Sequence, residues 1–377
     1  MARRPPPQPP QDAAAAAVRV IDTVLAAADL AAIVLGDRTG WYAALADGRP
    51  RTAPDLAAAT ATSARYALEW CEQQAATGLL EVVAEGEPAD QRLYRLPAGL
   101  AAVLAEPDSP AGLAPLVRQM AAAVGGLPRL EQAYRDGTGV GWSEHGPAML
   151  SVQAETNRAA FAHLLPGWFA AIPDVHARLQ AAGSRIADIG CGLAWSSIAL
   201  ARAYPQASVD AVDIEPQTVV LARQNVIEAG LDGRIAVHRV DAAGAAGAGL
   251  RPGYDLVTAF ECIHDLPDPV AVLASMRGLA AGSGTVVIAD EAVGERFRAP
   301  AGRLERLMYG FSLLICLPDS MCTPGSAAIG TVMRPDTLRA LAAQAGFDQV
   351  DVLPIEHDSW RFYRLRVTPP AAVPGTR

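Results

Sequence analysis

Lysine is absent from this sequence of 377 residues, and all 31 of its basic residues are arginine. The absence excludes enzymes that form a lysine Schiff base, covalent pyridoxal enzymes, and the lysine of a phosphate-binding P-loop. The formal net charge of the chain is −9. This charge disfavours nucleic acid as a partner, because phosphate neutralisation requires positive charge.

Cysteines and long apolar runs are also scarce. The five cysteines are odd in number and form no CxxC pair, which argues against a disulfide framework and against a structural zinc site. Apolar stretches such as residues 30–35 are far shorter than the roughly 18 residues that span a bilayer. Residues 1–11 are rich in arginine and proline and have no adjoining apolar core, so they do not resemble a signal peptide. We expect a cytoplasmic protein with no membrane partner.

The residues that are present predict two folded domains. Hydrophobic residues make up 51% of the chain, which is enough for sizeable cores. Residues 1–12 form a proline-rich tail that we expect to be disordered. Residues 13–105 show helical periodicity followed by two short strand-like runs, and this order of helix, turn, helix and hairpin is the winged-helix plan. Residues 106–182 read as several helices, a linker or a cap over the substrate.

Residues 183–377 predict an α/β domain. Strand and helix patterns alternate through this region, which favours a mostly parallel sheet covered by helices on both faces. The last two strand-like runs, residues 347–354 and 361–367, have a short connector and suit an antiparallel pair at the edge of the sheet. Residues 292–334 lack the alternating pattern, and we expect them to form an insertion over one end of the sheet.

A glycine turn is the sharpest signal in the sequence. A strand pattern runs into Gly190-Cys-Gly192, and a helix pattern follows. Two such glycines let the backbone approach a ligand, and the helix N-terminus offers free N–H groups, although an ordinary tight turn would look alike. A dinucleotide site would require a third glycine where this chain has Trp195. Asp188, within the turn, would repel a pyrophosphate and attract an amine or another cation.

Two further acids follow the next two predicted strands. Asp213 stands where a carboxylate can bind the two hydroxyls of a ribose. Asp241 can accept a hydrogen bond from an exocyclic amine such as that of adenine. Three acids at three consecutive strand ends describe a ligand with a ribose, an adenine and a positive end, and S-adenosylmethionine has all three.

These motifs resemble those of the class I S-adenosylmethionine-dependent methyltransferases, over residues 183–367. Residues 187–192 match the first motif of that family, Asp213 the second and Asp241 the third, while the usual further glycine is Ala194 here. With its winged-helix region, the whole chain is similar to bacterial methyltransferases that carry this added domain. The resemblance implies a Rossmann-like core with a terminal antiparallel hairpin, preceded by an α-helical winged-helix domain. It implies S-adenosylmethionine as the cofactor, held by Asp188, Gly190, Gly192, Asp213, Ile214, Asp241, Ala242 and Phe260.

His264 is the first candidate for a catalytic base. It follows the fourth predicted strand, at the carboxyl edge of the sheet where ligands bind in open α/β folds. Asp265 could orient it or contact the cofactor, and the alternative is that both residues only cap the next helix. His145 is the second candidate, in a glycine-rich loop beside Trp142 that could fold over the cofactor or simply connect two helices.

The sequence also contains candidate residues for a metal site and for a substrate pocket. Glu261, His264 and Asp265 could ligate a metal, but no second histidine cluster lies nearby in sequence, so we predict no metal. The insertion supplies apolar and soft side chains that could line a lid or pocket, or be ordinary core. The predicted substrate pocket consists of Trp142, Glu261, Tyr309 and Cys316.

The winged helix could read DNA or pair two subunits. Its presumed recognition helix, residues 63–77, carries Arg65 but also Glu69 and Glu72, and such carboxylates would face phosphates. The family resemblance implies the other use, pairing two subunits into a homodimer and roofing the active site. We therefore predict a small-molecule methyltransferase acting by O- or C-methylation in specialised metabolism. The alternative is a regulator, or another protein that binds S-adenosylmethionine without transferring its methyl group.

Overall fold

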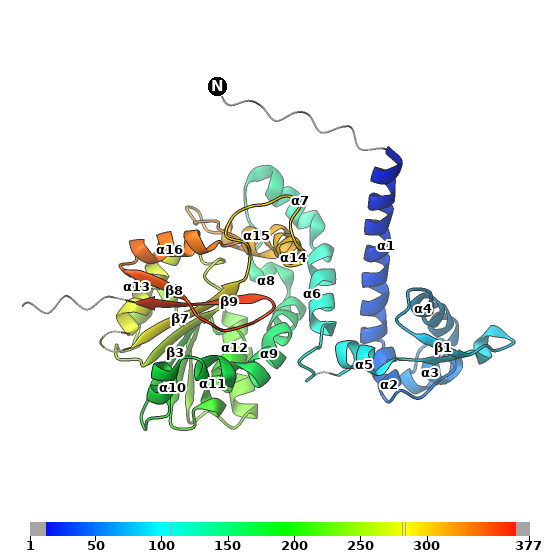
Figure 1. The fold of residues 1–377 in the computed structure, drawn as a ribbon, viewed down its shortest axis with the longest axis horizontal. Helices are drawn as coiled ribbons and strands as arrows, with labels where there is room; N and C mark the ends of the chain where they lie inside the picture. Colours follow the sequence, from blue (N-terminus) through cyan, green and yellow to red (C-terminus); the bar gives the residue numbers. More distant parts are fainter. Residues whose placement is uncertain (1–12, 107, 281, 283, 367–377) are drawn as a thin grey trace, which may run out of the picture. The chain divides into compact units, whose positions relative to one another are not determined.

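The computed structural model describes residues 13–106, 108–280, 282 and 284–366 (Figure 1). The chain forms two compact units, Met1–Ala121 and Ala122–Arg377. The division falls inside helix α6 (Ala114–Gly125), within the stretch 106–182 that we expected to form several helices as a linker or a substrate cap. The expected disorder of residues 1–12 lies outside the described residues.

The first unit has the order of elements that the sequence predicted. Thr52 caps α3, because its hydroxyl accepts a hydrogen bond from the backbone N–H of Asp55 at 3.2 Å. The buried core of this unit includes Trp41, Leu56 and Trp70. The elements are α1 (Ala13–Arg38), α2 (Trp41–Leu45), α3 (Ala53–Thr60), α4 (Ala64–Ala76), the antiparallel pair β1 (Glu81–Ala84) and β2 (Leu93–Arg95) with η1 (Ala89–Gln91) between them, and α5 (Ala98–Leu104).

Helices open the second unit, and a seven-stranded sheet follows in the order β5-β4-β3-β6-β7-β9-β8. Strands β3 to β7 are parallel, while β9 is antiparallel to both β7 and β8. The predicted parallel sheet with a terminal antiparallel hairpin is therefore confirmed. The helices before the sheet are α7 (Leu127–Asp136), α8 (Trp142–His145), α9 (Pro147–Ala170) and α10 (Pro173–Leu179). The strands are β3 (Arg185–Ile189), β4 (Ser208–Asp213), β5 (Ile235–Arg239), β6 (Leu256–Phe260), β7 (Thr285–Glu291), β8 (Gln349–Val352) and β9 (Trp360–Arg366).

Helices cover both faces of this sheet (Figure 1). Side chains of α9, α10, α11 (Trp195–Ala203) and α12 (Pro216–Glu228) form one buried cluster with one face of the strands. Side chains of α13 (Pro269–Leu279) and α16 (Pro335–Gln344) form a second cluster with the opposite face. Successive residues of β3 divide between the two clusters, Ile186 in the first and Ala187 in the second, as the period of two along a strand requires.

The predicted insertion holds α14 (Arg303–Phe311), a π-helical segment η3 (Ser312–Cys316) and α15 (Leu317–Ser320). The loop before α8 is attached to it, because the N–H of Val140 donates to the carbonyl of Pro318 at 3.0 Å. None of the helices described in this structure is long and apolar enough to cross a membrane.

Candidate functional site

The glycine turn between β3 and α11 requires its glycines for two different reasons. Gly190 has a φ of 67°, and a Cβ added there would lie 2.7 Å from Sγ of Cys262, so no larger residue fits. Gly192 has a φ of 53°, but an added Cβ would meet no atom within 4 Å. The space next to Gly192 is thus open to a ligand. Ala194 has a φ of 65°, a left-handed conformation in which glycine is more stable by about 1 kcal/mol.

Asp188 supports this turn from the protein interior. Its side chain is 1% exposed. One carboxylate oxygen accepts hydrogen bonds from the hydroxyls of Ser196 and Ser197, both at 2.6 Å, and the other accepts from Thr258 at 2.9 Å. The carboxylate is therefore buried among three hydroxyl groups of the protein, and the geometry corrects our expectation that Asp188 faces a cationic ligand. The carboxylate instead anchors the first turn of α11 to the sheet.

Asp213, at the end of β4, lies on the ligand side of the turn. One of its oxygens accepts from the N–H of Gly192 at 3.0 Å and the other from the N–H of Glu215 at 2.9 Å. Burial raises the pKa of this carboxyl to about 6, against the lowering effect of those two N–H groups. Ile214, the next residue, is 60% exposed.

Asp241 follows β5 and caps the short helix η2 (Ala242–Gly247), accepting from the N–H of Ala243 at 2.9 Å. Because β5, β4 and β3 are neighbours in the sheet, the glycine turn, Asp213 and Asp241 share its carboxyl edge. An open cradle at Gly192 and two carboxylates at successive strand ends fit a nucleoside with a ribose and an amine-bearing base. These residues could therefore hold S-adenosylmethionine.

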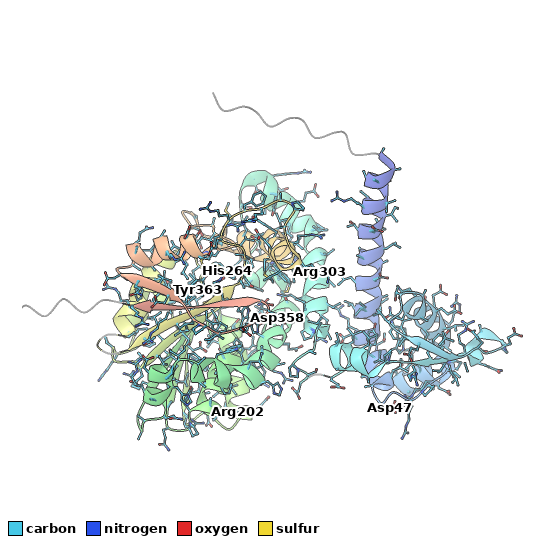
Figure 2. The ribbon with its side chains drawn as sticks, in the orientation of Figure 1. Asp47, Arg202, His264, Arg303, Asp358 and Tyr363 are labelled. Carbon is cyan, nitrogen blue, oxygen red and sulfur yellow. The ribbon has the colours of Figure 1, made fainter. Side chains whose placement is uncertain are left out.

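His264 lies past the end of β6 and is only 2% exposed (Figure 2). Its Nδ1 lies 2.8 Å from Oδ1 of Asp290, and its Nε2 lies 3.2 Å from Oδ1 of Asp265. Burial lowers the pKa of this imidazole, but the charges of Asp290 and Asp265 outweigh that effect and raise the pKa well above its usual value. The predicted pair of His264 and Asp265 is thus held together, and Asp290 orients the ring.

Cys316 joins this group from the π-helical segment. Ligand atoms of His264, Asp265 and Cys316 all lie within 4.8 Å of one another. Burial raises the pKa of the Cys316 thiol to about 12, so it is a neutral group in the free protein. Histidine, aspartate and cysteine are residue types that can ligate a metal. The metal site considered from the sequence consisted of Glu261, His264 and Asp265, whereas here Cys316 stands in place of Glu261.

Glu261 belongs to a neighbouring polar group at the ends of β6 and β7. Its carboxylate accepts hydrogen bonds from Asn157 of α9 and from the indole N–H of Trp360. Glu291 is its neighbour at the end of β7, and burial together with the charge of Glu261 raises the pKa of the Glu291 carboxyl well above its usual value. Glu261 has a φ of 49°, an uncommon conformation for a residue with a side chain and one that is frequent at functional sites.

An aromatic wall stands beside this group. Phe260 is 7% exposed, and its ring packs edge-on against Phe161 with centroids 5.2 Å apart. The ring of Phe161 also lies 5.5 Å from that of Trp360. The wall therefore joins β6, β9 and α9 on one side of the site.

His145 and Trp142 occupy the loop and helix before α9. The two rings lie 6.1 Å apart. The ring of His145 lies near Gly126, just before α7, where an added Cβ would be 3.9 Å from its Nδ1, while the candidate base His264 contacts Asp290 and Asp265. Burial and the charge of Arg129 lower the pKa of His145. The backbone N–H of Trp142 donates to Asp319 of α15 at 2.9 Å. Burial and the charge of Asp265 raise the pKa of Asp319 to about 7.

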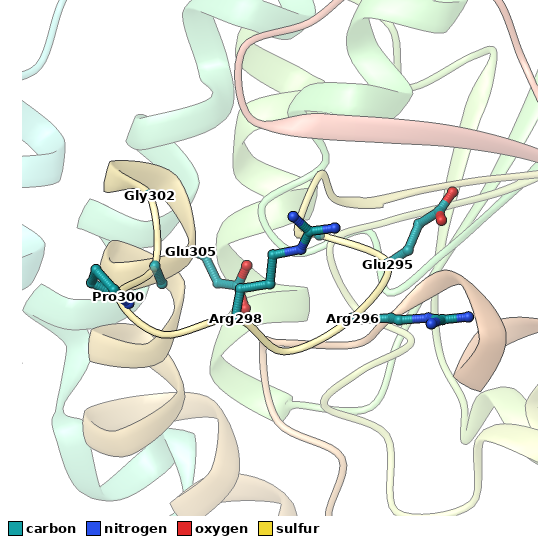
Figure 3. A pocket seen from close by; sticks show the side chains of 8 residues that line it. Glu295, Arg296, Arg298, Pro300, Gly302 and Glu305 are labelled. Atoms are coloured by element: carbon teal, nitrogen blue, oxygen red, sulfur yellow. The ribbon is translucent and has the colours of Figure 1, made fainter. Parts of the chain in front are cut away.

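Tyr309 lies apart from the other predicted pocket residues. Arg334 donates to its hydroxyl at 3.3 Å and to Glu305 at 2.6 Å. Glu305 lines a surface pocket of about 530 Å³ formed mostly by residues 294–302, across which Arg298 extends (Figure 3). The structure thus brings Glu261 and Cys316 to the ends of β6 and β7, while Tyr309 is linked through Arg334 to Glu305 of this pocket without lining it.

Four residues of the site were missed in the sequence: Asn157, Asp290, Glu291 and Trp360. A strand was predicted over residues 285–290, so Asp290 ends it and Glu291 follows it, and the argument from strand ends that found Asp213 could have found both. Trp360 pairs with Glu291 across the antiparallel strands, and no short motif marks such a partner. Asn157 comes from a helix whose contacts the sequence pattern does not indicate.

Comparison with known proteins agrees with this geometry. A family profile described as "Methyltransferase domain" matches residues 187–286. A protein of Xanthomonas oryzae pv. oryzae named ubiquinone biosynthesis O-methyltransferase is 32% identical over 190 residues, which cover 50% of this chain and 72% of that protein. The match with this relative therefore spans half of the chain.

Solved structures match nearly the whole chain. An O-methyltransferase family protein from Burkholderia thailandensis superposes with a TM-score of 0.71 at 17% identity, covering 94% of this chain and 98% of the other. Human N-acetylserotonin methyltransferase, solved in complex with S-adenosylmethionine, superposes with a TM-score of 0.65 at 17% identity, covering 96% and 100%. At these identities the two structures show a shared fold.

Proposed function

Because this chain belongs to the class I S-adenosylmethionine-dependent methyltransferases, we propose that it methylates an oxygen atom of a compact small molecule. One observation carries the proposal: Gly190 of the cofactor turn lies against Cys262, two residues before the buried His264. The segment that holds the candidate base is therefore in contact with the segment that would hold the cofactor, which is the proximity that methyl transfer requires.

S-adenosylmethionine supplies an activated methyl group, and the protein has to position the acceptor and remove its proton. Asp290 holds the ring of His264 through Nδ1, which directs Nε2 toward Asp265. The contact between Nε2 and Asp265 lacks the geometry of a hydrogen bond, since Oδ1 of Asp265 has no hydrogen-bond partner in the described part of the chain. The hydroxyl group of the methyl acceptor can give its proton to the pair of His264 and Asp265. Asp290 acts as a positioning residue for His264.

Transfer of an isotope-labelled methyl group would test the proposed activity. We expect the full chain, incubated with labelled S-adenosylmethionine and an extract of small metabolites, to produce labelled methyl ethers detectable by mass spectrometry. Label on carbon would support C-methylation. Cofactor binding without labelled product would support the alternative, a protein that binds S-adenosylmethionine without transferring its methyl group.

The first unit, which we propose to be a winged-helix domain, has arginines that are already paired with carboxylates. Arg65 of α4 pairs with Glu69. Arg92, before β2, pairs with Glu72 at 2.8 Å and with Glu85 at 2.9 Å. A DNA-binding surface needs guanidinium groups that can reach phosphates, so these pairs favour a role other than binding nucleic acid.

A homodimer is the role that we propose for this unit. Helix α1 exposes six large apolar side chains, each 57–63% exposed: Val18, Val20, Ile21, Val24, Leu25 and Leu35. Apolar side chains gathered on one helix are typical of an interaction surface, and a second copy of the chain could cover them. We expect the double variant Ile21→Glu, Leu25→Glu to sediment as a monomer and the wild type as a dimer. A wild-type monomer at micromolar concentration would contradict this.

We also propose a cytoplasmic location and a substrate from specialised metabolism. All five cysteines are free thiols, which suits a reducing compartment. The assignment to specialised metabolism rests on family analogy.

A further inference from the structure

Two carboxyl groups face each other beside the candidate base. Glu261 follows β6 and Glu291 ends the adjacent parallel strand β7. Burial and the charge of Glu261 raise the pKa of the Glu291 carboxyl well above its usual value, so two negative charges at this place disfavour each other. Glu261 accepts from both Asn157 and Trp360, which stabilises its charged form. Glu291 is therefore the protonated member of the pair.

Glu291 has one oxygen without a partner. The residue is 4% exposed, and its Oε2 is buried without any hydrogen-bond partner among the described residues. A buried polar atom left unpaired is unfavourable, and such atoms are rare enough in folded proteins to require an explanation. A donor group on a bound ligand would supply the missing hydrogen bond.

The charges around this oxygen are mostly negative. Several charged groups shift the pKa values of Glu261, Glu291 and Asp265. Among those that act most strongly in the described part of the chain, His264 is the only cation. Asp290 also acts on Glu291 and Asp265. Even with His264 protonated and one glutamate neutral, the group of Glu261, Glu291, Asp265, Asp290 and His264 keeps a net negative charge. A carboxylate or phosphate ligand would be repelled, and a cation attracted.

We propose that the pair of Glu261 and Glu291 binds a protonated amine of the methyl acceptor. The inference rests on the proposed function, since it names the class of molecule that the methyltransferase takes: a compact amine that also carries the hydroxyl to be methylated. The ammonium donates to Oε2 of Glu291 and lies against the charge of Glu261. The aromatic wall of Phe161, Phe260 and Trp360 packs against the apolar body of such a molecule, and an aromatic face also attracts a cation.

Three probes of one shape but different charge would test the proposal. Tyramine carries an ammonium, 4-(2-hydroxyethyl)phenol is its neutral analogue, and 3-(4-hydroxyphenyl)propionate is its anionic analogue. We expect calorimetry on the full chain, saturated with S-adenosylhomocysteine, to show tyramine binding at least 10-fold more tightly than the neutral probe. The anionic probe should bind most weakly. Equal affinities, a preference for the acid, or no tyramine binding at millimolar concentration would overturn the proposal.

Variants connect this preference to the two glutamates. In the double variant Glu261→Gln, Glu291→Gln both side chains keep their shape and can still hydrogen bond, but the charge is removed. We expect it to bind tyramine and the neutral probe equally. Glu295→Gln, an exposed residue of the pocket in Figure 3, should keep the wild-type preference. A preference that persists in the double variant would overturn the assignment. If the double variant does not fold, as judged by circular dichroism, the ranking of the three probes with wild type decides.

These binding measurements do not depend on turnover. A negative result for the amine site can therefore be distinguished from a negative result for the proposed function. Selective binding of tyramine together with no methyl transfer to any hydroxyl would support the amine site and contradict O-methylation. Methyl transfer to neutral or acidic metabolites together with no selectivity for tyramine would support O-methylation and overturn the amine site.

Discussion

Replacement of Asp213 by alanine should weaken the binding of S-adenosylmethionine by about 100-fold or more, measured by calorimetry. The carboxylate is the group that can accept from two ribose hydroxyls, and a hydrogen bond to a charged group contributes about 1.5–3 kcal/mol. It also accepts from the N–H of Gly192, so its removal loosens the glycine turn. Asp232→Ala, at an exposed position in the connection after α12, is the matched control and should leave the affinity unchanged.

Acid should reproduce part of this effect in the wild type. Burial raises the pKa of Asp213 to about 6, so the carboxylate is protonated as the pH falls through that value and accepts hydrogen bonds less well. Cofactor affinity should therefore decrease below about pH 6 and level off above it. Asp213→Ala should lack this dependence. Equal affinities of the variant and the wild type at pH 7.5 would remove Asp213 from the cofactor site.

Replacement of His264 by alanine should lower kcat by about 10²–10⁴-fold, the range associated with a positioned acid–base group. Cofactor affinity should change little, because the ring contacts Asp290 and Asp265 and not the residues that would hold the ribose or adenine. The two quantities are measured by labelled methyl transfer and by calorimetry. His238→Ala is the matched control, since His238 also pairs with an aspartate, Asp210 at 2.7 Å, on β5 and β4 away from Cys262.

The pH dependence of turnover separates a base from a structural histidine. Because the two carboxylates raise the pKa of His264 well above its usual value, the ring keeps its proton to a higher pH than an ordinary histidine does. Turnover by the wild type should increase with pH above neutrality as that proton is lost. Asp290→Asn removes one of the charges and should shift the rise to lower pH. Full activity of His264→Ala would show that this histidine has only a structural role.

Most of the sheet could be predicted from the sequence, because its signals are local. The turn at Gly190 and Gly192 and the alternation of strands and helices fix the parallel order. Contacts between distant segments left no such signal. The attachment of the loop at Val140 to Pro318 joins residues 178 positions apart, and neither segment has a composition that indicates the other.

The candidate site was predicted in part for the same reason. Asp213 and His264 were found because they follow strands of a recognisable pattern. Asp188 was placed correctly at the turn but facing the wrong way, since sequence does not show that Ser196, Ser197 and Thr258 provide three hydroxyls to a buried carboxylate. Tyr309 was grouped with Cys316 because both lie in the insertion, although the intervening π-helical turn sends them to different surroundings.

That wide turn, Ser312–Cys316, carries one residue more than a regular helix would over the same rise. Each residue of a helix advances the side-chain direction by about 100°. Because the extra residue is taken up within the turn, deleting it would let the segment relax into ordinary helix with α15 nearly in its original direction, so Asp319 would still receive the Trp142 N–H. The extra residue therefore changes the side-chain directions only within the turn itself, which is where the thiol of Cys316 meets His264.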